Sequence, residues 1–312
     1  MRNTVVIIGS GLMGSGIAAC AALAGHSVAL IDLQLETAEK GVQNAFRCID
    51  ELCENALATQ EEALRAKDAI KASSKVEAYV DEALLVIEAI NENLPAKQAL
   101  FAHLDSIFPP EIPIVSNTSG LRITDIAEKT THPSRTVTTH FWFPGHLVPL
   151  VEVVVGDHTD IEVATQVRDL LLKWGKAAVL VKKDLPGQLA NRILQAMIRE
   201  AVNIVEIGLA SPEDVDTAIK MGMGIRLPLW GPLEHVDAVG LDLCMNVQKT
   251  VLPGISNATE PSPLFEGHVQ NGELGHKTGK GFYDWNVKDM DALAKRRNAF
   301  ILLARQFMAQ QP

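Results

Sequence analysis

Three glycines near the N-terminus constrain the fold of this chain more than any other feature of the sequence. The pattern G-x-G-x-x-G runs from Gly9 to Gly14, directly after the apolar run 5–8 and before a run of small, helix-compatible residues at 13–23. A second apolar run at 28–31 follows. A strand, a glycine turn, a helix and another strand at these intervals predict a parallel βαβ unit.

The glycine turn also predicts a dinucleotide site in that context. Gly9 allows the tight turn, Gly11 lets the backbone approach a pyrophosphate, and Gly14 lets the helix pack closely on the strand. Leu12 and Met13 begin the helix, where free N–H groups and the positive end of the helix dipole favour phosphate.

The acidic residue Asp32 ends the second apolar run. At this position a carboxylate accepts hydrogen bonds from the adenosine ribose hydroxyls, and its charge would repel a 2′-phosphate. No arginine follows it immediately. We therefore expect NAD as the cofactor rather than NADP.

Strand and helix patterns continue to alternate through the first half of the chain. Strand-like runs lie at 84–90, 135–141, 148–155 and 178–181. The polar stretch 36–69 has apolar residues near helical spacing but is longer than one crossover helix, so we expect a helical hairpin that protrudes from the sheet.

The pattern changes after Pro186-Gly187, a strong turn signal, because strand-like runs end there and helical periodicity begins. We expect an NAD-binding domain at 1–184, with a Rossmann-like, doubly wound and mostly parallel sheet. An all-helical domain at 185–312 should follow it, ending in an amphipathic helix at 287–311. A length of 312 residues also favours two domains.

Composition excludes several classes of partner. The formal net charge of −10 argues against nucleic acid or an anionic membrane as the main partner. No apolar run of about 18 residues could span a bilayer, and the N-terminus lacks a signal-peptide layout. The cysteines have no metal-binding spacing, so we expect no metal site and a reducing cytoplasm. They are Cys20, Cys48, Cys53 and Cys244.

Two titratable residues flank a short Pro/Gly loop. His140 ends one strand-like run and Glu152 lies inside the next, so an antiparallel pairing would bring them together. A carboxylate beside an imidazole fixes its tautomer and stabilises its charged form, as a general base requires. His146, within the loop, is the rival base. Asn117 and Ser119 follow another strand and could donate hydrogen bonds to substrate or cofactor, although turn residues of these types are also common for structural reasons.

At this point the sequence resembles the 3-hydroxyacyl-CoA dehydrogenase family, of the NAD-dependent, short, single-function type. The resemblance covers most of the chain and rests on motifs in the family's order. They are the Gly9 fingerprint, Glu88-Ala-Ile-Asn-Glu92-Asn, Ser116-Asn-Thr-Ser119, the segment from His140 to Glu152, Lys183-Asp-Leu-Pro-Gly-Gln-Leu-Ala-Asn191-Arg192, Gly231-Pro-Leu, Asp237, Gly240-Leu-Asp242 and Lys277-Thr-Gly-Lys-Gly-Phe-Tyr283.

The resemblance implies a role for several residues by position. His140 would be the base and Glu152 its partner, Ser119 and Asn191 would bind the substrate near the reacting carbon, and Glu92 would lie near the nicotinamide. It also implies a helical domain that forms a homodimer, an active site in the cleft between the domains, and a place in fatty acid metabolism.

Three residues depart from this pattern or point to another substrate. Phe143 stands where the family has an asparagine in His-Phe-x-Asn-Pro, which implies a drier substrate pocket. Gln188 replaces the phenylalanine of Pro-Gly-Phe. Arg226 could pair with a free carboxylate as a bidentate fork, or it could be a surface or interface arginine.

The expected activity is NAD-dependent oxidation of a 3-hydroxyacyl-CoA, such as 3-hydroxybutyryl-CoA, to the 3-ketoacyl-CoA. One alternative is a dehydrogenase of a free hydroxy acid or other small carboxylated substrate without CoA. Another is a non-catalytic protein that kept the NAD-binding fold, although the intact set of Ser119, His140, Glu152 and Asn191 argues against it.

Overall fold

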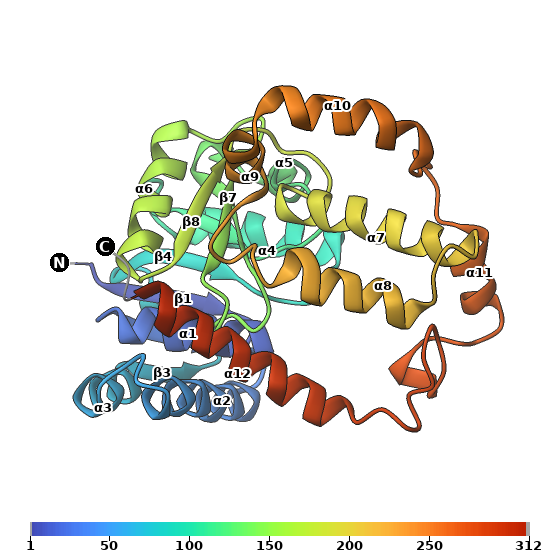
Figure 1. Ribbon diagram of the computed structural model, residues 1–312. Helices are drawn as coiled ribbons and strands as arrows, with labels where there is room; N and C mark the ends of the chain where they lie inside the picture. Colours follow the sequence, from blue (N-terminus) through green and yellow to red (C-terminus); the bar gives the residue numbers. More distant parts are fainter. Residues whose placement is uncertain (1, 310–312) are drawn as a thin grey trace. The chain divides into compact units, whose positions relative to one another are not determined.

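The computed structural model describes residues 2–309, and the chain divides into two compact units between Ala190 and Asn191. Unit 1 contains an eight-stranded sheet with helices on both faces, the Rossmann-like arrangement that the sequence predicted (Figure 1). Its strands are β1 (Thr4–Ile8), β2 (Ser27–Ile31), β3 (Ile70–Ser73), β4 (Ala83–Glu88), β5 (Ile114–Ser116), β6 (Thr136–Phe141), β7 (Leu150–Val154) and β8 (Ala177–Val181). Its helices include α1 (Leu12–Leu23), α2 (Leu35–Glu54), α3 (Gln60–Ala69), α4 (Leu94–Ile107), α5 (Ile123–Ile126) and α6 (Ile161–Lys173).

The strand order places a topological switch point at β1. The order is β3-β2-β1-β4-β5-β6-β7-β8, and every neighbouring pair is parallel except β6 and β7, which are antiparallel. The chain leaves β1 in one direction toward β2 and β3 and returns on its other side as β4. Ligands of such sheets bind at the carboxyl ends of the strands beside this point.

Alternating residues of the strands build two apolar layers. Val5 and Ile7 of β1 pack on one face with α1, α2 and α6, whereas Val6 and Ile8 pack on the other face with α4 and α5. Successive side chains of a strand point to opposite faces, so a strand covered on both sides must be apolar throughout. This explains the unbroken apolar runs in the first half of the sequence.

The predicted hairpin forms, as α2 and α3, but it does not protrude. Ala45 and Ile49 of α2 are buried against the core, and Ala63 of α3 belongs to the same apolar cluster. The apolar stripe of α2 therefore faces α1 rather than solvent. The edge strand β3 was not predicted, because only Ile70 among its four residues is buried and the sequence carries no strand pattern there.

Unit 2 is helical, as predicted. Its helices include α7 (Ala190–Glu206), α8 (Pro212–Ala218), α9 (Pro232–Val239), α10 (Leu241–Val251), α11 (Pro263–Gln270) and α12 (Met290–Ala309). The predicted terminal helix is α12, and residues 310 and 311 of that prediction lie outside the described residues. Across residues 2–309, no helix combines the length and the apolar character needed to cross a membrane.

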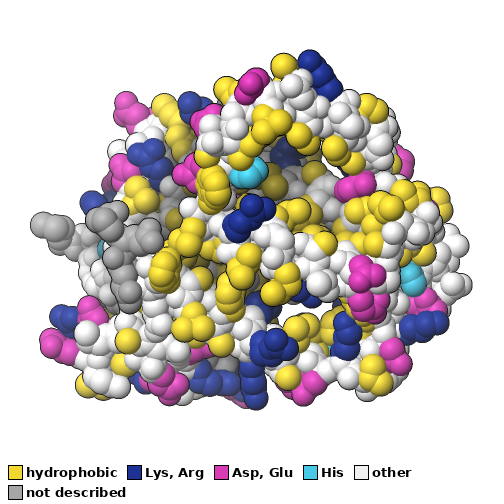
Figure 2. All heavy atoms as spheres, in the orientation of Figure 1, with side chains coloured by type: hydrophobic (Ala, Val, Ile, Leu, Met, Phe, Trp, Pro, Cys, Tyr) yellow, Lys and Arg dark blue, Asp and Glu magenta, His cyan; other side chains and the backbone are white. Residues whose placement is uncertain are grey.

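Few side chains of unit 2 are buried. Within its described residues, the buried hydrophobic side chains are those of Val202, Val215 and Leu302. Many large hydrophobic side chains on α10 and around it are exposed, and Figure 2 shows such side chains gathered over the surface of this unit. An apolar surface of this extent is typical of a protein that buries it against a partner.

Candidate active site

The glycine turn after β1 is built for close backbone packing at two positions and for access at the third. Gly9 has φ +101°, and a Cβ there would lie 2.4 Å from the carbonyl oxygen of Ala89. A Cβ on Gly14 would lie 1.8 Å from the oxygen of Gly9, whereas a Cβ on Gly11 would meet no atom within 4 Å. Gly9 and Gly14 are thus required by packing, and the space beside Gly11 is open to a ligand.

The N-terminus of α1 lies at this turn. Gly11 is its N-cap and provides no side-chain cap, while Leu12 and Met13 form the first turn. Backbone N–H groups at a helix start have no partner within the helix and carry partial positive charge, so they bind phosphate. These features fit the pyrophosphate of a dinucleotide.

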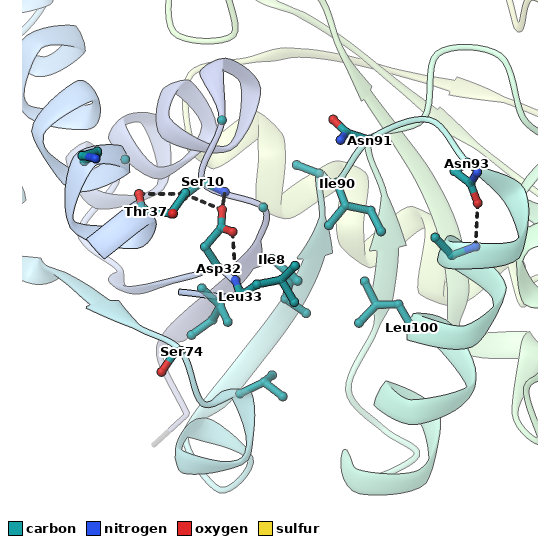
Figure 3. Close-up of a pocket in the computed structure, with 18 of the residues that line it drawn as sticks. Ile8, Ser10, Asp32, Leu33, Thr37, Ser74, Ile90, Asn91, Asn93 and Leu100 are labelled. Carbon is teal, nitrogen blue, oxygen red and sulfur yellow. Dashed lines mark hydrogen bonds between the residues drawn. The ribbon is translucent and has the colours of Figure 1, made fainter. Parts of the chain in front are cut away.

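A cavity of about 1100 Å³ lies beside the switch point (Figure 3). It extends from the turn after β1 to the loop after β4 and is bordered by residues of α2 and α4. Its walls are partly apolar, with Ile8, Ile90 and Leu100 among the residues that Figure 3 labels. Of its lining residues, the sequence predicted Gly9, Gly11 and Asp32. The apolar walls were missed because their residues come from separate strands and helices.

Asp32 points into this cavity from the end of β2. Its Oδ2 accepts hydrogen bonds from the N–H (2.9 Å) and hydroxyl (2.6 Å) of Ser10, and its Oδ1 accepts one from the N–H of Leu33 (2.8 Å). Partial burial would raise the pKa of Asp32, but these hydrogen bonds outweigh it and hold the pKa below its usual value. The carboxylate is therefore charged where a ribose would lie, which fits NAD.

His140 and Glu152 meet across the only antiparallel pair of the sheet in unit 1. The register places His140 directly opposite Glu152, and Nδ1 of His140 lies 2.8 Å from Oε2 of Glu152. The exposed fraction is 6% for His140 and 0% for Glu152. The pairing predicted from the sequence is therefore present, at the edge of the sheet where β1, β4 and β5 also end.

Glu152 accepts four hydrogen bonds. Besides His140, the indole N–H of Trp142 donates to Oε2 (2.9 Å), and the backbone N–H groups of Leu189 (2.9 Å) and Ala190 (2.8 Å) donate to Oε1. Burial raises the pKa of Glu152, but these four donors overcome it and lower the pKa to about 2. Glu152 is thus a carboxylate at any physiological pH.

This charge fixes the tautomer of His140. A carboxylate can only accept, so Nδ1 of His140 must carry the proton that lies between the two side chains. Nε2 then holds the lone pair of the neutral ring, and it is the atom that can take a proton from a substrate.

The sequence reasoning missed Trp142, Leu189 and Ala190. Trp142 also contacts the ring of His140, with 5.7 Å between centroids and an interplanar angle of 50°. Trp142 lies two residues after His140, and side chains two residues apart in extended backbone point to the same side. This spacing could have predicted that Trp142 lies beside His140. The two backbone donors come from a distant turn, and no sequence pattern announces them.

Ser119 and Glu92 belong to one network at the ends of β4 and β5. Oε1 of Glu92 accepts hydrogen bonds from the hydroxyl of Thr118 (2.6 Å) and from the N–H groups of Ser119 and Gly120 (both 3.1 Å). These bonds leave the Ser119 side chain exposed. Glu92 therefore shapes the loop that presents Ser119.

A buried ion pair supports this network. Nζ of Lys97 lies 2.6 Å from Oε1 of Glu88 and 3.2 Å from Oε2 of Glu92, and the side chains of Lys97 and Glu88 are almost completely buried. Burial raises the pKa of Glu92, but Thr118, Lys97 and the N–H of Gly120 lower it more, so its pKa lies below the usual value. Removal of one partner from such a buried pair is strongly destabilising.

Asn117 connects the ends of β5 and β6. Its Oδ1 accepts a hydrogen bond from the N–H of Phe141 (2.9 Å), and its own N–H donates to the carbonyl of Glu88 (2.8 Å). The side chain thus secures the backbone next to His140, and its predicted contact with substrate or cofactor stays a prediction.

The loop between β6 and β7 is anchored on the C-terminal side of Phe143. Nε2 of His146 lies 2.8 Å from Oε2 of Glu51 on α2, and Nζ of Lys176 donates to the carbonyl of Gly145 (2.6 Å). Phe143 itself is 54% exposed. The contact to Glu51 gives His146 a structural partner away from Glu152, which weakens its candidacy as the base.

Two predicted residues, Asn191 and Arg226, lie in unit 2. Asn191 is half-buried in the first turn of α7 and follows Ala190, which donates to Glu152. Arg226 is exposed shortly after the π-helical turn η4 (Ile219–Gly224). The structure brings together His140 with Glu152, and Ser119 with Glu92, within unit 1.

Models of known protein families match nearly the whole chain. The NAD binding domain of 3-hydroxyacyl-CoA dehydrogenase matches residues 4–185, and the C-terminal domain of the same family matches residues 187–285. The curated "Probable 3-hydroxybutyryl-CoA dehydrogenase" of Bacillus subtilis is 40% identical over 91% of this chain and 98% of its own length.

Solved structures agree with this assignment. The structure of an NAD+-dependent 5-formyl-3-hydroxy-2-methylpyridine 4-carboxylic acid 5-dehydrogenase covers 100% of both chains, with a TM-score of 0.91 and 29% identity. The (S)-3-hydroxybutyryl-CoA dehydrogenase of Ralstonia eutropha has a TM-score of 0.76 and 33% identity over 91% of this chain and 99% of its own. The chain belongs to the 3-hydroxyacyl-CoA dehydrogenase family and is an NAD-dependent oxidoreductase.

Proposed function

We propose that the protein oxidises the hydroxyl group of a 3-hydroxyacyl-CoA, such as 3-hydroxybutyryl-CoA, to the ketone. The observation that carries this proposal is the buried His140–Glu152 pair, with its 2.8 Å contact, in the same unit as a cavity suited to a dinucleotide. The 40% identity to a relative named for 3-hydroxybutyryl-CoA supports the choice of substrate.

In the proposed reaction, Nε2 of His140 removes the proton of the substrate hydroxyl as the carbonyl double bond forms. The hydrogen on the same carbon leaves with its electron pair, and NAD+, when bound, accepts it as hydride. The ring becomes an imidazolium, whose charge is stabilised by the Glu152 carboxylate 2.8 Å away. The oxidation thus removes one proton, which His140 accepts, and one hydride, which would pass to the cofactor.

The remaining predicted residues would bind and orient the reactants. The turn from Gly9 to Gly14 and Asp32 would hold the dinucleotide, with Glu92 shaping the adjacent loop. Ser119 and Asn191 would hydrogen-bond the substrate oxygen near Nε2 of His140. This arrangement limits the reacting groups to one geometry, which is a large part of enzymatic rate enhancement.

A second candidate substrate is a small carboxylated molecule without CoA. The solved dehydrogenase of a pyridine carboxylic acid aligns with this chain over its full length, whereas the family model ends at residue 285, before α12. Arg226 would pair with the carboxylate in a bidentate contact, and Phe143 would supply an apolar wall.

Steady-state kinetics distinguishes the two substrates. The quantity to compare is kcat/KM for NADH formation with 3-hydroxybutyryl-CoA, with free 3-hydroxybutyrate and with hydroxylated aromatic carboxylic acids. A higher value for the CoA ester than for every free acid is expected. Activity confined to the free acids, and abolished by Arg226→Ala, would establish the second candidate instead.

We further propose that the protein is a homodimer formed through unit 2. The exposed apolar side chains of this unit support the proposal, because a helical unit with so few buried residues gains little stability from its own core. A second copy of the chain would cover this surface by an isologous contact.

A further inference from the structure

Gln188 occupies a backbone conformation and an environment that a glutamine rarely adopts. Its φ is +53°, in the left-handed region that favours glycine, and its side chain is only 6% exposed. Among the described residues, its Oε1 is buried and has no hydrogen-bond partner. Both features destabilise the folded state, so folding alone does not explain a glutamine here.

The side-chain amide reaches the loop that carries Ser119. Nε2 of Gln188 donates a hydrogen bond to the carbonyl oxygen of Thr118, at 3.1 Å, and a carbonyl can only accept, which fixes the orientation of the amide. Thr118 directly precedes Ser119 and is itself held by Glu92 through its hydroxyl.

The backbone that follows Gln188 reaches the other half of the site. The N–H groups of Leu189 and Ala190, the next two residues, both donate to Oε1 of Glu152. The left-handed turn at Gln188 redirects the chain so that these two groups face the carboxylate. Gln188 is therefore bonded to the Ser119 loop through its side chain and directly precedes the two N–H groups that bind Glu152.

We propose that Gln188 is a positioning residue, which fixes the distance between the Ser119 loop and the His140–Glu152 pair. This inference rests on the proposed function, in which Ser119 holds the substrate oxygen and His140 removes its proton. Ser119 and His140 must both contact the same hydroxyl. A loose connection between them would therefore lower the rate of the chemical step more than it would weaken the binding of either reactant.

Two substitutions separate the hydrogen bond from the backbone strain. Gln188→Met keeps the size and the strained φ but removes the donor, whereas Gln188→Gly removes the donor and relieves the strain. Each should lower kcat by about tenfold with the KM for NAD+ unchanged. Ala56→Gly is the matched control, because Ala56 has φ +56° in the turn after α2 and the change relieves strain without altering the site. Its kcat should equal that of the wild type.

A double variant tests whether the effect passes through the base. If Gln188 acts by positioning, Gln188→Met should have little further effect on kcat in a His140→Gln background, where base catalysis is already lost. A kcat within twofold of the wild type for both Gln188 variants would overturn the proposal. An undiminished tenfold effect in the His140→Gln background would overturn it as well.

Hydrogen exchange provides a readout that does not depend on activity. In folded Gln188→Gly, the amides of 118–121 and of 188–190 should both exchange faster than in the wild type, because each segment loses the same restraint. Faster exchange at 188–190 alone would contradict the proposal. A His140→Gln variant with normal turnover would instead refute the proposed function, and the exchange result would still decide the role of Gln188.

Discussion

Glu152 combines complete burial with a negative charge and four hydrogen bonds. It is fully buried, yet four donors keep it ionised and lower its pKa to about 2. Two of these donors are the side chains of His140 and Trp142, which bind Oε2, and the other two are the backbone N–H groups of 189–190, which bind Oε1. A residue so placed fixes the tautomer of His140 and stabilises the backbone around it.

Substitution of Trp142 tests the contribution of a single donor. Trp142→Phe keeps an aromatic ring beside His140 but removes the hydrogen bond to Oε2 of Glu152. We expect kcat to fall by about three- to tenfold, since a hydrogen bond to a charged group contributes about 1.5–3 kcal/mol and three donors remain. Trp174→Phe is the matched control, because within the described residues the indole N–H of Trp174 has no hydrogen-bond partner. Equal effects of the two changes on kcat would contradict the assignment.

The pH dependence of stability follows from the lowered pKa of Glu152. The folded protein favours the ionised form, so the stabilisation is complete above the usual value of 4.5 and is lost as the pH falls toward 2. The loss should be about 2 kcal/mol between pH 7 and pH 3, measured by urea unfolding. Glu152→Gln should show a shallower decline over this range. Identical pH slopes for the two proteins would refute this prediction.

At the scale of elements, two glycines of the turn after β1 have different roles: Gly14 allows close packing, whereas Gly11 leaves space for a ligand. Gly11→Ala places its Cβ in open space, so the melting temperature should be unchanged while the Kd for NAD+ rises about tenfold or more. Gly14→Ala places its Cβ 1.8 Å from the oxygen of Gly9, so it should lower both the melting temperature and the affinity. Calorimetry of both variants measures the two quantities. Unchanged NAD+ affinity in Gly11→Ala would contradict the proposed position of the pyrophosphate.

The elements also show how far sequence reasoning reaches. Buried strands such as β1 and β4 are unbroken apolar runs, and β6 and β7 needed only a short loop to bring His140 opposite Glu152, so local patterns sufficed. The edge strand β3 lacks such a pattern. The bond from Leu189 to Glu152 and the bond from Gln188 to Thr118 join segments 37 and 70 residues apart, so they depend on tertiary packing that no local spacing encodes.

At the scale of the whole molecule, the exposed apolar surface of unit 2 predicts association. Sedimentation equilibrium should give twice the chain mass of 33.8 kDa at micromolar concentration. Low salt and high salt should give the same result, because burial of apolar surface, unlike ion pairing, is not screened by salt. A mass of a single chain under both conditions would refute the homodimer.

In the proposed reaction, His140 is the base for oxidation of a substrate hydroxyl by NAD+. The most direct measurement is the rate of NADH formation by the wild type and by His140→Gln with 3-hydroxybutyryl-CoA, together with the Kd of each for NAD+. We expect His140→Gln to lose a factor of about 10² or more in kcat with an unchanged Kd, since only the proton acceptor is removed. A His140→Gln variant that turns over at a rate near that of the wild type would contradict the claim.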